Sequence, residues 1–262
     1  MNYEFITVEN SEQAICTITI NRPDVYNALN RQSKFELIDA LEKAGLDQEV
    51  KAIILSAKGK AFCSGQDLND RANQDSTEKK DLGETLKTEW NPLVNAIRNC
   101  PKIVVAAING VTAGAGISVA MACDLIVAPP KTRFVSGFTK LGLVPDAGST
   151  HTFTHSLGPK MAMEFFLFNQ PLHSEDLQKV GLINKIEENT LEFAQKWCEQ
   201  IAQMAPLSIA HLKKNIQKAA HMSFLDSMSN ETESQCFLGQ SEDFKEGVQS
   251  FFEKRTPVFR GV

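Results

Sequence analysis

The sequence predicts an α/β fold with a helical C-terminal region. Short apolar segments alternate with segments of helical periodicity over residues 14–150, and helical patterns dominate from about residue 191 onward. The chain has 262 residues, of which 42% are hydrophobic and 23% are charged. A chain of this length can bury a full hydrophobic core without help from disulfides or metal. We therefore expect one large α/β unit followed by a smaller helical part.

The first predicted elements are a strand and a helix. Apolar and polar residues alternate over 14–20, which is typical of a strand, and Asn30 is placed to cap the helix that follows. Four apolar residues at helical spacing are expected to form the buried face of that helix: Phe35, Ile38, Leu41 and Leu46. The run Ala-Ile-Ile-Leu at 52–55 predicts a short buried strand.

A polar and charged segment follows at residues 66–84. Its composition predicts an exposed flap in front of a helix that carries Trp90, Leu93 and Ile97.

The alternation then repeats with a strand at 103–108, a helix at 114–122 and a strand at 125–128. The 21 residues from Ile103 to Cys123 carry no charge, but their glycines and polar residues are unfavourable for a membrane-spanning helix. We interpret them as a buried strand, a glycine turn and a buried helix, and expect no membrane partner.

The C-terminal third is predicted to be mostly helical. A short strand is expected at 182–186 and a helix break at Pro206, and amphipathic stretches run through 207–216 and 237–252. Their apolar faces predict packing against the core or against a neighbouring subunit.

Charge and cysteine usage exclude several classes of protein. A net charge of -5 and a pI near 5.6 argue against a chain that neutralises nucleic-acid phosphates. The six cysteines form no CxxC pair and fit neither a zinc ribbon nor a disulfide framework. The first ten residues lack a basic region followed by an apolar run. We expect free thiols and a cytoplasmic protein.

Three glycine-containing turns are candidates for a functional site, at residues 61–68, 109–116 and 142–148. The first two follow predicted strands, where a small residue lets the backbone present an N–H group outward. Two such N–H groups facing one point would form an oxyanion hole. Glycine after a strand is also common in a simple turn, so both interpretations stay open here.

The spacing of residues argues against several other kinds of site. The glycines at 110–116 do not form GxGxxG, no GK[ST] follows a glycine loop, and no GxSxG is present. Cys63 has no base that the sequence reveals. His151 and His155 are four residues apart and could share a helix face, but no third ligand is visible at a matching spacing. We therefore predict no metal site and interpret these histidines as helix-surface or subunit-contact residues.

Asp146 is the candidate acid. It follows Pro145 and precedes a predicted helix, so it could simply be the N-cap. In apolar surroundings, however, a carboxyl group loses solvation and its pKa rises from about 3.9, which suits a proton shuttle. The local pattern leaves both roles open.

The ordered set of motifs resembles the crotonase family, the enoyl-CoA hydratase/isomerase superfamily. The resemblance runs essentially from end to end and rests on these segments: NRPDVYNALN, KAFCSGQDL, AAINGVTAGAGISVAMACDLIVA, FTKLGLVPDAGST and FFEKRTPVF. It implies a spiral of ββα units over residues 1–200 that binds acyl-CoA, and a helical oligomerisation region at 201–262. It also implies homotrimers or homohexamers, an acyl-CoA thioester substrate, and no cofactor, because coenzyme A is part of the substrate.

The resemblance assigns roles to individual positions. The main-chain N–H groups of Gln66 and Ala115 would form the oxyanion hole, and family members often have glycine at the place of Ala115. The positions expected to line coenzyme A are Val25, Ala28, Ser64, Asp67 and Leu68. Lys254, which could reach from an adjacent subunit, resembles the residue that contacts the nucleotide phosphates. Each of these could instead maintain the fold, above all Asp67, whose carboxylate could brace its own turn.

The departures from the family pattern indicate the reaction. Hydratases of the family hold two glutamates, and Ser118 and Phe138 occupy those positions here. Loss of both carboxylates should cost orders of magnitude in hydration rate. Asp146 remains, at a position that is acidic in several isomerase branches, with Phe138 among the apolar walls that would keep it basic. Ser118 could bind substrate or water, or could be a helix-packing hydroxyl.

Several segments resemble one branch of the family, which converts 1,2-epoxyphenylacetyl-CoA to oxepin-CoA in phenylacetate catabolism. They are FCSGQDLND, NGVTAGAG, KLGLVPDAGST and EGVQSFFEKRTPVF. The resemblance therefore implies an acyl-CoA isomerase of phenylacetate or fatty acid metabolism in which Asp146 shuttles a proton. The alternatives are an enoyl-CoA hydratase with a non-standard acid/base and a non-catalytic acyl-CoA-binding protein.

Overall fold

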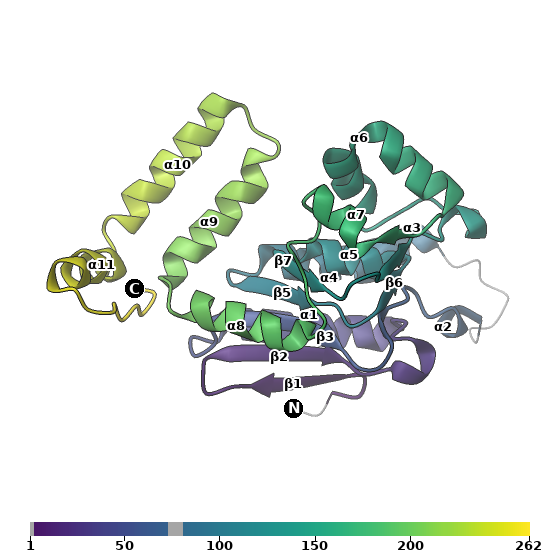
Figure 1. Ribbon diagram of the computed structural model, residues 1–262, viewed down its shortest axis with the longest axis horizontal. Helices are drawn as coiled ribbons and strands as arrows, with labels where there is room; N and C mark the ends of the chain where they lie inside the picture. The colour runs from purple at the N-terminus through teal and green to yellow at the C-terminus, as the bar shows by residue number, and fades with distance from the viewer. Residues whose placement is uncertain (1–2, 73–80) are drawn as a thin grey trace.

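The computed structural model describes residues 3–72 and 81–262, and its strands form two sheets (Figure 1). The larger sheet has six strands: β1 (Ile6–Asn10), β2 (Ile15–Ile20), β3 (Ala52–Ala57), β5 (Ile103–Ala107), β7 (Leu125–Ala128) and β10 (Lys185–Ile186). The smaller sheet has four: β4 (Ala61–Cys63), β6 (Val111–Ala113), β8 (Arg133–Val135) and β9 (Leu172–His173).

From β3 to β8, successive strands alternate between the two sheets. The larger sheet has the order β1-β2-β3-β5-β7-β10 and the smaller one β4-β6-β8-β9, so β3, β5 and β7 are each followed by a strand of the smaller sheet and then by helical chain. The pairs β3/β5, β5/β7, β4/β6 and β6/β8 are all parallel. Repetition of this ββα unit is the predicted spiral, and the α/β fold class is confirmed.

Helices cover the spiral and extend beyond it. Those that belong to its first turns are α1 (Arg31–Leu46), α2 (Asn69–Ala72), α3 (Leu82–Thr85), α4 (Asn91–Asn99) and α5 (Ala115–Ala122), with a π-helical turn at Leu86–Trp90 joining α3 to α4. The later ones are α6 (Ser149–Phe168), α7 (Ser174–Lys179), α8 (Thr190–Ala202), α9 (Pro206–Ala219), α10 (Phe224–Leu238) and α11 (Glu242–Glu253). Short 3-10 turns lie at Pro23–Val25 and Thr139–Leu141.

The core lies on both faces of the larger sheet. All six residues of β3 are buried, as expected for a parallel strand covered on two sides. Side chains of α1, α4 and α5 belong to the core cluster on one face, and Ala194 and Cys198 of α8 pack on the other. Every residue of α5 is buried, so this helix runs through the interior and carries its N-terminus to the edge of the smaller sheet.

The C-terminal helices leave the spiral. In Figure 1, α9 and α10 project away from the sheets and α11 lies at the far end of the molecule. Lys213 of α9 ties this region to the core, because its buried ammonium donates to Asp124 Oδ2 at 2.7 Å and to the carbonyls of Ile97 and Lys102. The expected boundary between residues 200 and 201 falls inside α8.

Most predicted elements are present, with one correction to α1. Asn30 caps this helix as predicted, accepting a hydrogen bond from the Ser33 N–H at 2.8 Å. The buried face was misassigned, since Phe35 and Leu46 are exposed. Leu41 is buried as predicted and Ile38 is partly buried, whereas Lys34 and Leu37, each one residue earlier than a predicted position, complete the buried face.

The uncharged segment from Ile103 to Cys123 forms β5, β6 and α5, which confirms its interpretation as strand, turn and buried helix. Within the described ranges no helix combines the length and apolar character that crossing a membrane requires. The predicted flap at 66–84 falls partly on residues 73–80, which lie outside the described residues.

Candidate active site

The first two glycine turns lie against each other. A Cβ added to Gly65 would sit only 3.1 Å from the Ala113 carbonyl oxygen and 3.1 Å from the Ala115 nitrogen. Gly65 has φ +93°, a conformation that glycine adopts without strain. Glycine is required here both for the backbone conformation and for the close approach of the two turns.

Gly116 brings the next residue of the same helix into contact with β4. A Cβ at this position would lie 2.3 Å from the Cys63 carbonyl oxygen, a distance that no real atom pair of this kind tolerates. The start of α5 therefore packs directly on the backbone that leads into Gln66.

Two main-chain N–H groups of this junction are available to a ligand. The Leu29 N–H donates to the Gly65 carbonyl and the Asp67 N–H donates to the Leu29 carbonyl. The N–H of Gln66, which lies between these two residues, therefore points away from Leu29. Ala115 is the first residue of α5, where a helix leaves its N–H groups without intrahelical partners. In the part of the chain that the structure describes, neither N–H donates to a protein acceptor. Both donors of the predicted oxyanion hole are therefore available, on turns that touch.

The Gln66 side chain is fixed by a buried polar network. Its Oε1 accepts hydrogen bonds from Lys34 Nζ at 3.0 Å and Trp90 Nε1 at 3.1 Å, and its Nε2 donates to the Asp67 carbonyl. Lys34 is fully buried and forms an ion pair with Glu89. The network fixes the residue whose N–H is predicted to be one of the two oxyanion donors.

Sequence reasoning missed this network. The usable signal was the spacing of Lys34, Leu37 and Leu41, which places a lysine on the buried face of α1. A buried lysine requires a partner, and Glu89 supplies it from the π-helical turn before α4. That long-range pairing could not be read from the sequence.

The turn expected to line coenzyme A packs on the Gln66 turn. The Ser64 N–H donates to the Tyr26 carbonyl at 3.1 Å, and the Ser64 hydroxyl donates to the Val25 carbonyl at 3.4 Å. Ala28 is buried, and its neighbour Leu29 donates to the Gly65 carbonyl. Val25, Ala28 and Ser64 are therefore close to Gln66.

Asp67 and Leu68, the other two positions expected to line coenzyme A, differ in their exposure and contacts. The Asp67 carboxylate is buried, pairs with Arg22 at 2.8 Å and accepts a hydrogen bond from the Asn69 N–H. It braces its own turn, as the alternative interpretation allowed. Leu68 is 55% exposed and available at the surface.

Asp146 lies beside α5, the helix that begins with Ala115. The Ser118 hydroxyl, one turn into α5, donates to the Asp146 carbonyl at 3.0 Å. The Ser149 N–H and hydroxyl, at 3.0 and 2.9 Å, donate to the same carbonyl. The Asp146 Oδ1 atom is buried. The candidate acid is thus held between the starts of α5 and α6.

Asp146 is not the N-cap of α6. The helix begins at Ser149 and its N-cap is Gly148, so the capping interpretation is wrong. Asp146 precedes two left-handed residues, Ala147 at φ 48° and Gly148 at φ 88°.

The remaining two predicted site residues are Phe138 and Lys254. Phe138 is buried in the core cluster and starts the 3-10 turn before Gly142, where its carbonyl accepts from the Leu143 N–H at 3.0 Å. Lys254 is exposed at the C-cap of α11, at the opposite end of the molecule from α2 and β6 (Figure 1). Within one chain, Lys254 is therefore not part of this site.

Cys63 is not a nucleophile. It is fully buried, and burial raises the pKa of its thiol to about 12. A thiol with this pKa carries almost no thiolate near neutral pH.

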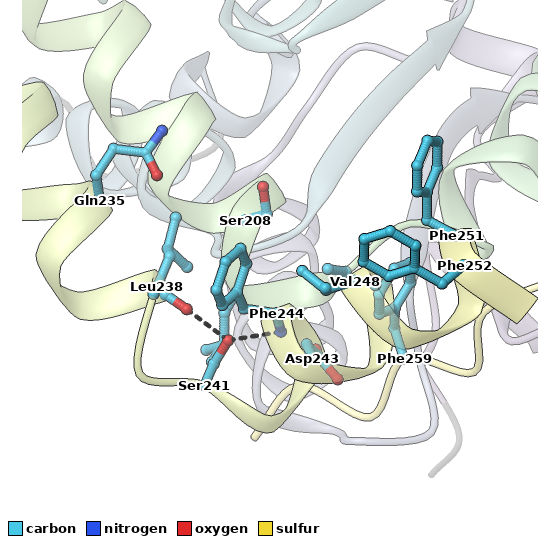
Figure 2. A pocket seen from close by; sticks show the side chains of 14 residues that line it. Ser208, Gln235, Leu238, Ser241, Asp243, Phe244, Val248, Phe251, Phe252 and Phe259 are labelled. Carbon is cyan, nitrogen blue, oxygen red and sulfur yellow. Dashed lines mark hydrogen bonds between the residues drawn. The ribbon is translucent and has the colours of Figure 1, made fainter.

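Two hollows bear on the site and on the C-terminal helices. A cavity of about 390 Å³ lies against Ser118, Ala147 and Ser149. A more apolar groove of about 780 Å³ lies between α9, α10 and α11, and Figure 2 shows the rings of Phe244, Phe251 and Phe252 along it. The first hollow lies beside the candidate acid, and the second belongs to the C-terminal region.

Comparison with known proteins agrees with this geometry. A family model described as Enoyl-CoA hydratase/isomerase matches residues 10–262. The chain is 39% identical to a probable enoyl-CoA hydratase of Rhodobacter capsulatus, over 100% of both chains. It is 33% identical to the 1,2-epoxyphenylacetyl-CoA isomerase of Escherichia coli, over 98% of this chain and 99% of that one. The crystal structure of an enoyl-CoA hydratase from Bacillus anthracis superposes with a TM-score of 0.91 at 25% identity, over 99% of this chain and 100% of that one.

Proposed function

This chain belongs to the enoyl-CoA hydratase/isomerase family, and within that family of enzymes acting on CoA thioesters we propose that it is an isomerase. It would shift the double bond of a 3-enoyl-CoA to the 2 position, convert 1,2-epoxyphenylacetyl-CoA to oxepin-CoA, or do both. The observation that carries the proposal is the single carboxylate Asp146, tied through Ser118 to the helix that starts with Ala115.

The proposed double-bond shift needs one base that becomes an acid. The Asp146 carboxylate takes a proton from C2 of the 3-enoyl thioester, and the electron pair spreads into a dienolate. The protonated carboxyl then returns a proton to C4, which leaves the double bond between C2 and C3. A single carboxylate completes this cycle without net change in protonation.

The two main-chain N–H groups supply the electrostatic part. Negative charge gathers on the thioester oxygen as the dienolate forms, and the N–H groups of Gln66 and Ala115 would donate to that oxygen. Loss of one such donor typically costs about 2.7 to 4 kcal/mol of transition-state stabilisation. The close approach of Gly65 to the Ala115 turn supports the pair, because it places the two donors on turns that touch.

The epoxide reaction would use the same groups. Ring opening and expansion of 1,2-epoxyphenylacetyl-CoA also places charge on the thioester oxygen, where the two N–H groups would hold it. The E. coli isomerase of this substrate, 33% identical over nearly the whole chain, supports this assignment.

The second candidate function is enoyl-CoA hydration with Asp146 as the only carboxylate. The relative at 39% identity, a probable enoyl-CoA hydratase, favours it. Against it stand Ser118 and Phe138, both buried, at the positions where the resemblance places the two hydratase glutamates. A third candidate, acyl-CoA binding without catalysis, rests on the same missing glutamates.

A turnover screen separates the three candidates. The purified chain is given 3-enoyl-CoA, epoxyphenylacetyl-CoA and crotonyl-CoA, and product formation is followed for each. Turnover of the first or second ester with little water addition to the third is expected. Faster hydration of crotonyl-CoA than isomerisation of either other ester would identify a hydratase. Binding of a CoA ester without turnover of any would identify a binding protein.

We also propose that residues 201–262 mediate assembly into a homotrimer or homohexamer, while residues 1–200 bind acyl-CoA. The apolar groove between α9, α10 and α11 supports this, because Phe251 and Phe252 are each 77% exposed in the single chain. Lys254 could then contact the nucleotide phosphates of a neighbouring subunit's substrate.

A further inference from the structure

Three histidines from two distant parts of the chain converge at one place. His151 and His155 lie on consecutive turns of α6, and His221 lies in the turn between α9 and α10. Their candidate ligand atoms all lie within 4.8 Å of one another. The sequence showed the first two histidines, and the fold brings the third from 66 residues further along the chain.

We propose that His151, His155 and His221 bind a divalent transition metal ion such as Zn²⁺. Neutral imidazole is a strong ligand for Zn²⁺, Ni²⁺, Cu²⁺ and Co²⁺, and three imidazoles with water completing the coordination form a known type of zinc site. The His151 and His155 rings are stacked at 4.0 Å between centroids, and the His151 and His221 centroids are 4.9 Å apart. Small side-chain rotations would bring the three nitrogens to the spacing that a common metal ion requires.

The hydrogen bonding of His155 favours a ligand role. Its Nδ1 lies 2.9 Å from the His151 carbonyl oxygen, and a carbonyl oxygen can accept a hydrogen bond but cannot donate one. Nδ1 must therefore carry the proton, and Nε2 is left as the lone-pair donor. Metal-binding histidines commonly use their second nitrogen in this way, to fix the ring and its tautomer.

Arg98 lines the same cavity as His151 and His221, and its positive charge opposes a cation, so the ion must be held by coordination rather than by charge. This disfavours Mg²⁺ and Ca²⁺, which need oxygen ligands.

A bound ion would join two parts of the molecule. His151 and His155 belong to the helix that follows Asp146, whereas His221 belongs to the hairpin of α9 and α10 that projects from the spiral (Figure 1). The metal would tie that hairpin to α6 and stabilise their junction. The inference does not depend on the proposed isomerase activity.

Zn²⁺ titration of the tag-free chain by calorimetry tests the inference. It is done in a Cys236→Ser background, because Cys236 is exposed and could itself bind zinc. One Zn²⁺ per chain is expected, with a rise in melting temperature on addition of metal. His155→Ala and His221→Ala should each weaken binding by more than about tenfold and abolish the rise.

His211→Ala is the matched control. This histidine is in α9 and stacks on Phe237, away from the cluster, so its removal should leave zinc binding unchanged. The proposal is overturned if the chain takes up no Zn²⁺ at a molar excess of metal. It is also overturned if His221→Ala binds as tightly and with the same stoichiometry as its parent.

Discussion

The backbone of Asp146 is held more firmly than its sequence neighbours suggest. Ala147 has φ 48°, a left-handed conformation that costs a residue with a Cβ roughly 1–2 kcal/mol. Such residues persist only where the surrounding contacts outweigh the cost, and they cluster at functional sites. Here the contacts are the three hydrogen bonds to the Asp146 carbonyl from Ser118 and Ser149.

Ser118→Ala tests the role of Ser118 as a positioning residue. It removes the link between α5 and Asp146, so kcat should fall up to about tenfold, as loss of one hydrogen bond worth about 0.5–1.5 kcal/mol allows. KM and the pH profile should not change, because the base itself remains. Steady-state kinetics with 3-enoyl-CoA across pH provide the measurement.

Ser149→Ala is the control for this variant. Ser149 donates to the same carbonyl but belongs to α6, so the link to α5 survives and kcat should stay close to that of the parent. A Ser118→Ala variant with unchanged kcat, or with an altered pH profile, would contradict the positioning role.

Lys34→Met is expected to destabilise the chain by about 3–5 kcal/mol. The change removes the buried ion-pair partner of Glu89, leaving only the exposed Arg31 at 3.7 Å, and removes a donor from Gln66. The urea midpoint of unfolding measures the effect. Lys43→Met, which removes an exposed i,i+4 pair with Asp39, should shift stability by less than about 1 kcal/mol. Equal shifts of the urea midpoint in the two variants would show that the buried ion pair contributes no more to stability than an exposed one.

At the scale of elements, the site depends on two strand-to-helix turns that touch. β4 and β6 are parallel neighbours in the smaller sheet, so the turns that follow them leave the same edge. Gly65 and Gly116 remove the side chains that would hold the turns apart. The closeness of the two proposed oxyanion donors thus follows from sheet register together with glycine at two positions.

Gly65→Ala should lower kcat/KM by about tenfold to a hundredfold. The new Cβ would press on Ala113 and on the Ala115 nitrogen at 3.1 Å, and small displacements at a reacting centre have effects of this size. Gly181→Ala is the matched control, since Gly181 also has positive φ, has nothing within 4 Å of its added Cβ and lies outside the three candidate turns. It should lose stability and keep kcat/KM. Equal loss of kcat/KM in both variants would mean that the backbone conformation, and not the contact, matters.

The sequence predicted the long elements better than the short ones. Strands β2, β3, β5 and β7 and helices α1, α4 and α5 have enough residues for a period to be read. The strands of the smaller sheet have two or three residues each, too few to show alternation. The first strand, β1, buries only one of its five residues, so its pattern is weak as well.

The candidate site was predicted from motifs, but the contacts that hold its residues in place were not predicted. The two turns and Asp146 could be identified because a resemblance assigns them a role. The Lys34–Glu89 pair, the link from Ser118 to Asp146 and the approach of His221 to His151 join residues far apart in the sequence. Such pairings depend on how the helices cross, which periodicity does not specify.

For the whole molecule, the arrangement of α9, α10 and α11 is the feature that bears on assembly. Lys213 anchors α9 to the core by three buried hydrogen bonds. Beyond that anchor, large apolar side chains face outward along the groove of Figure 2, among them Phe244, Phe251 and Phe252. An exposed apolar surface of this kind is typical of an interface between subunits.

Light scattering should therefore give a mass three or six times the 29.0 kDa of the chain. The double variant Phe251→Ser/Phe252→Ser should give a smaller species, because it removes two exposed rings from the interface. Leu46→Ser, at an 84% exposed position on α1, should keep the parent mass. A monomeric parent chain would contradict the proposed assembly.

The Asp146→Asn variant tests most directly whether the Asp146 carboxylate moves the proton. The amide keeps the shape of the side chain and cannot take up a proton, so isomerisation of a 3-enoyl-CoA should fall by about 10²–10⁴-fold. Binding of a CoA ester, measured by calorimetry on the same preparation, should be unchanged. Isomerisation at the parent rate in this variant would contradict the account, because the carboxylate would then have no part in moving the proton.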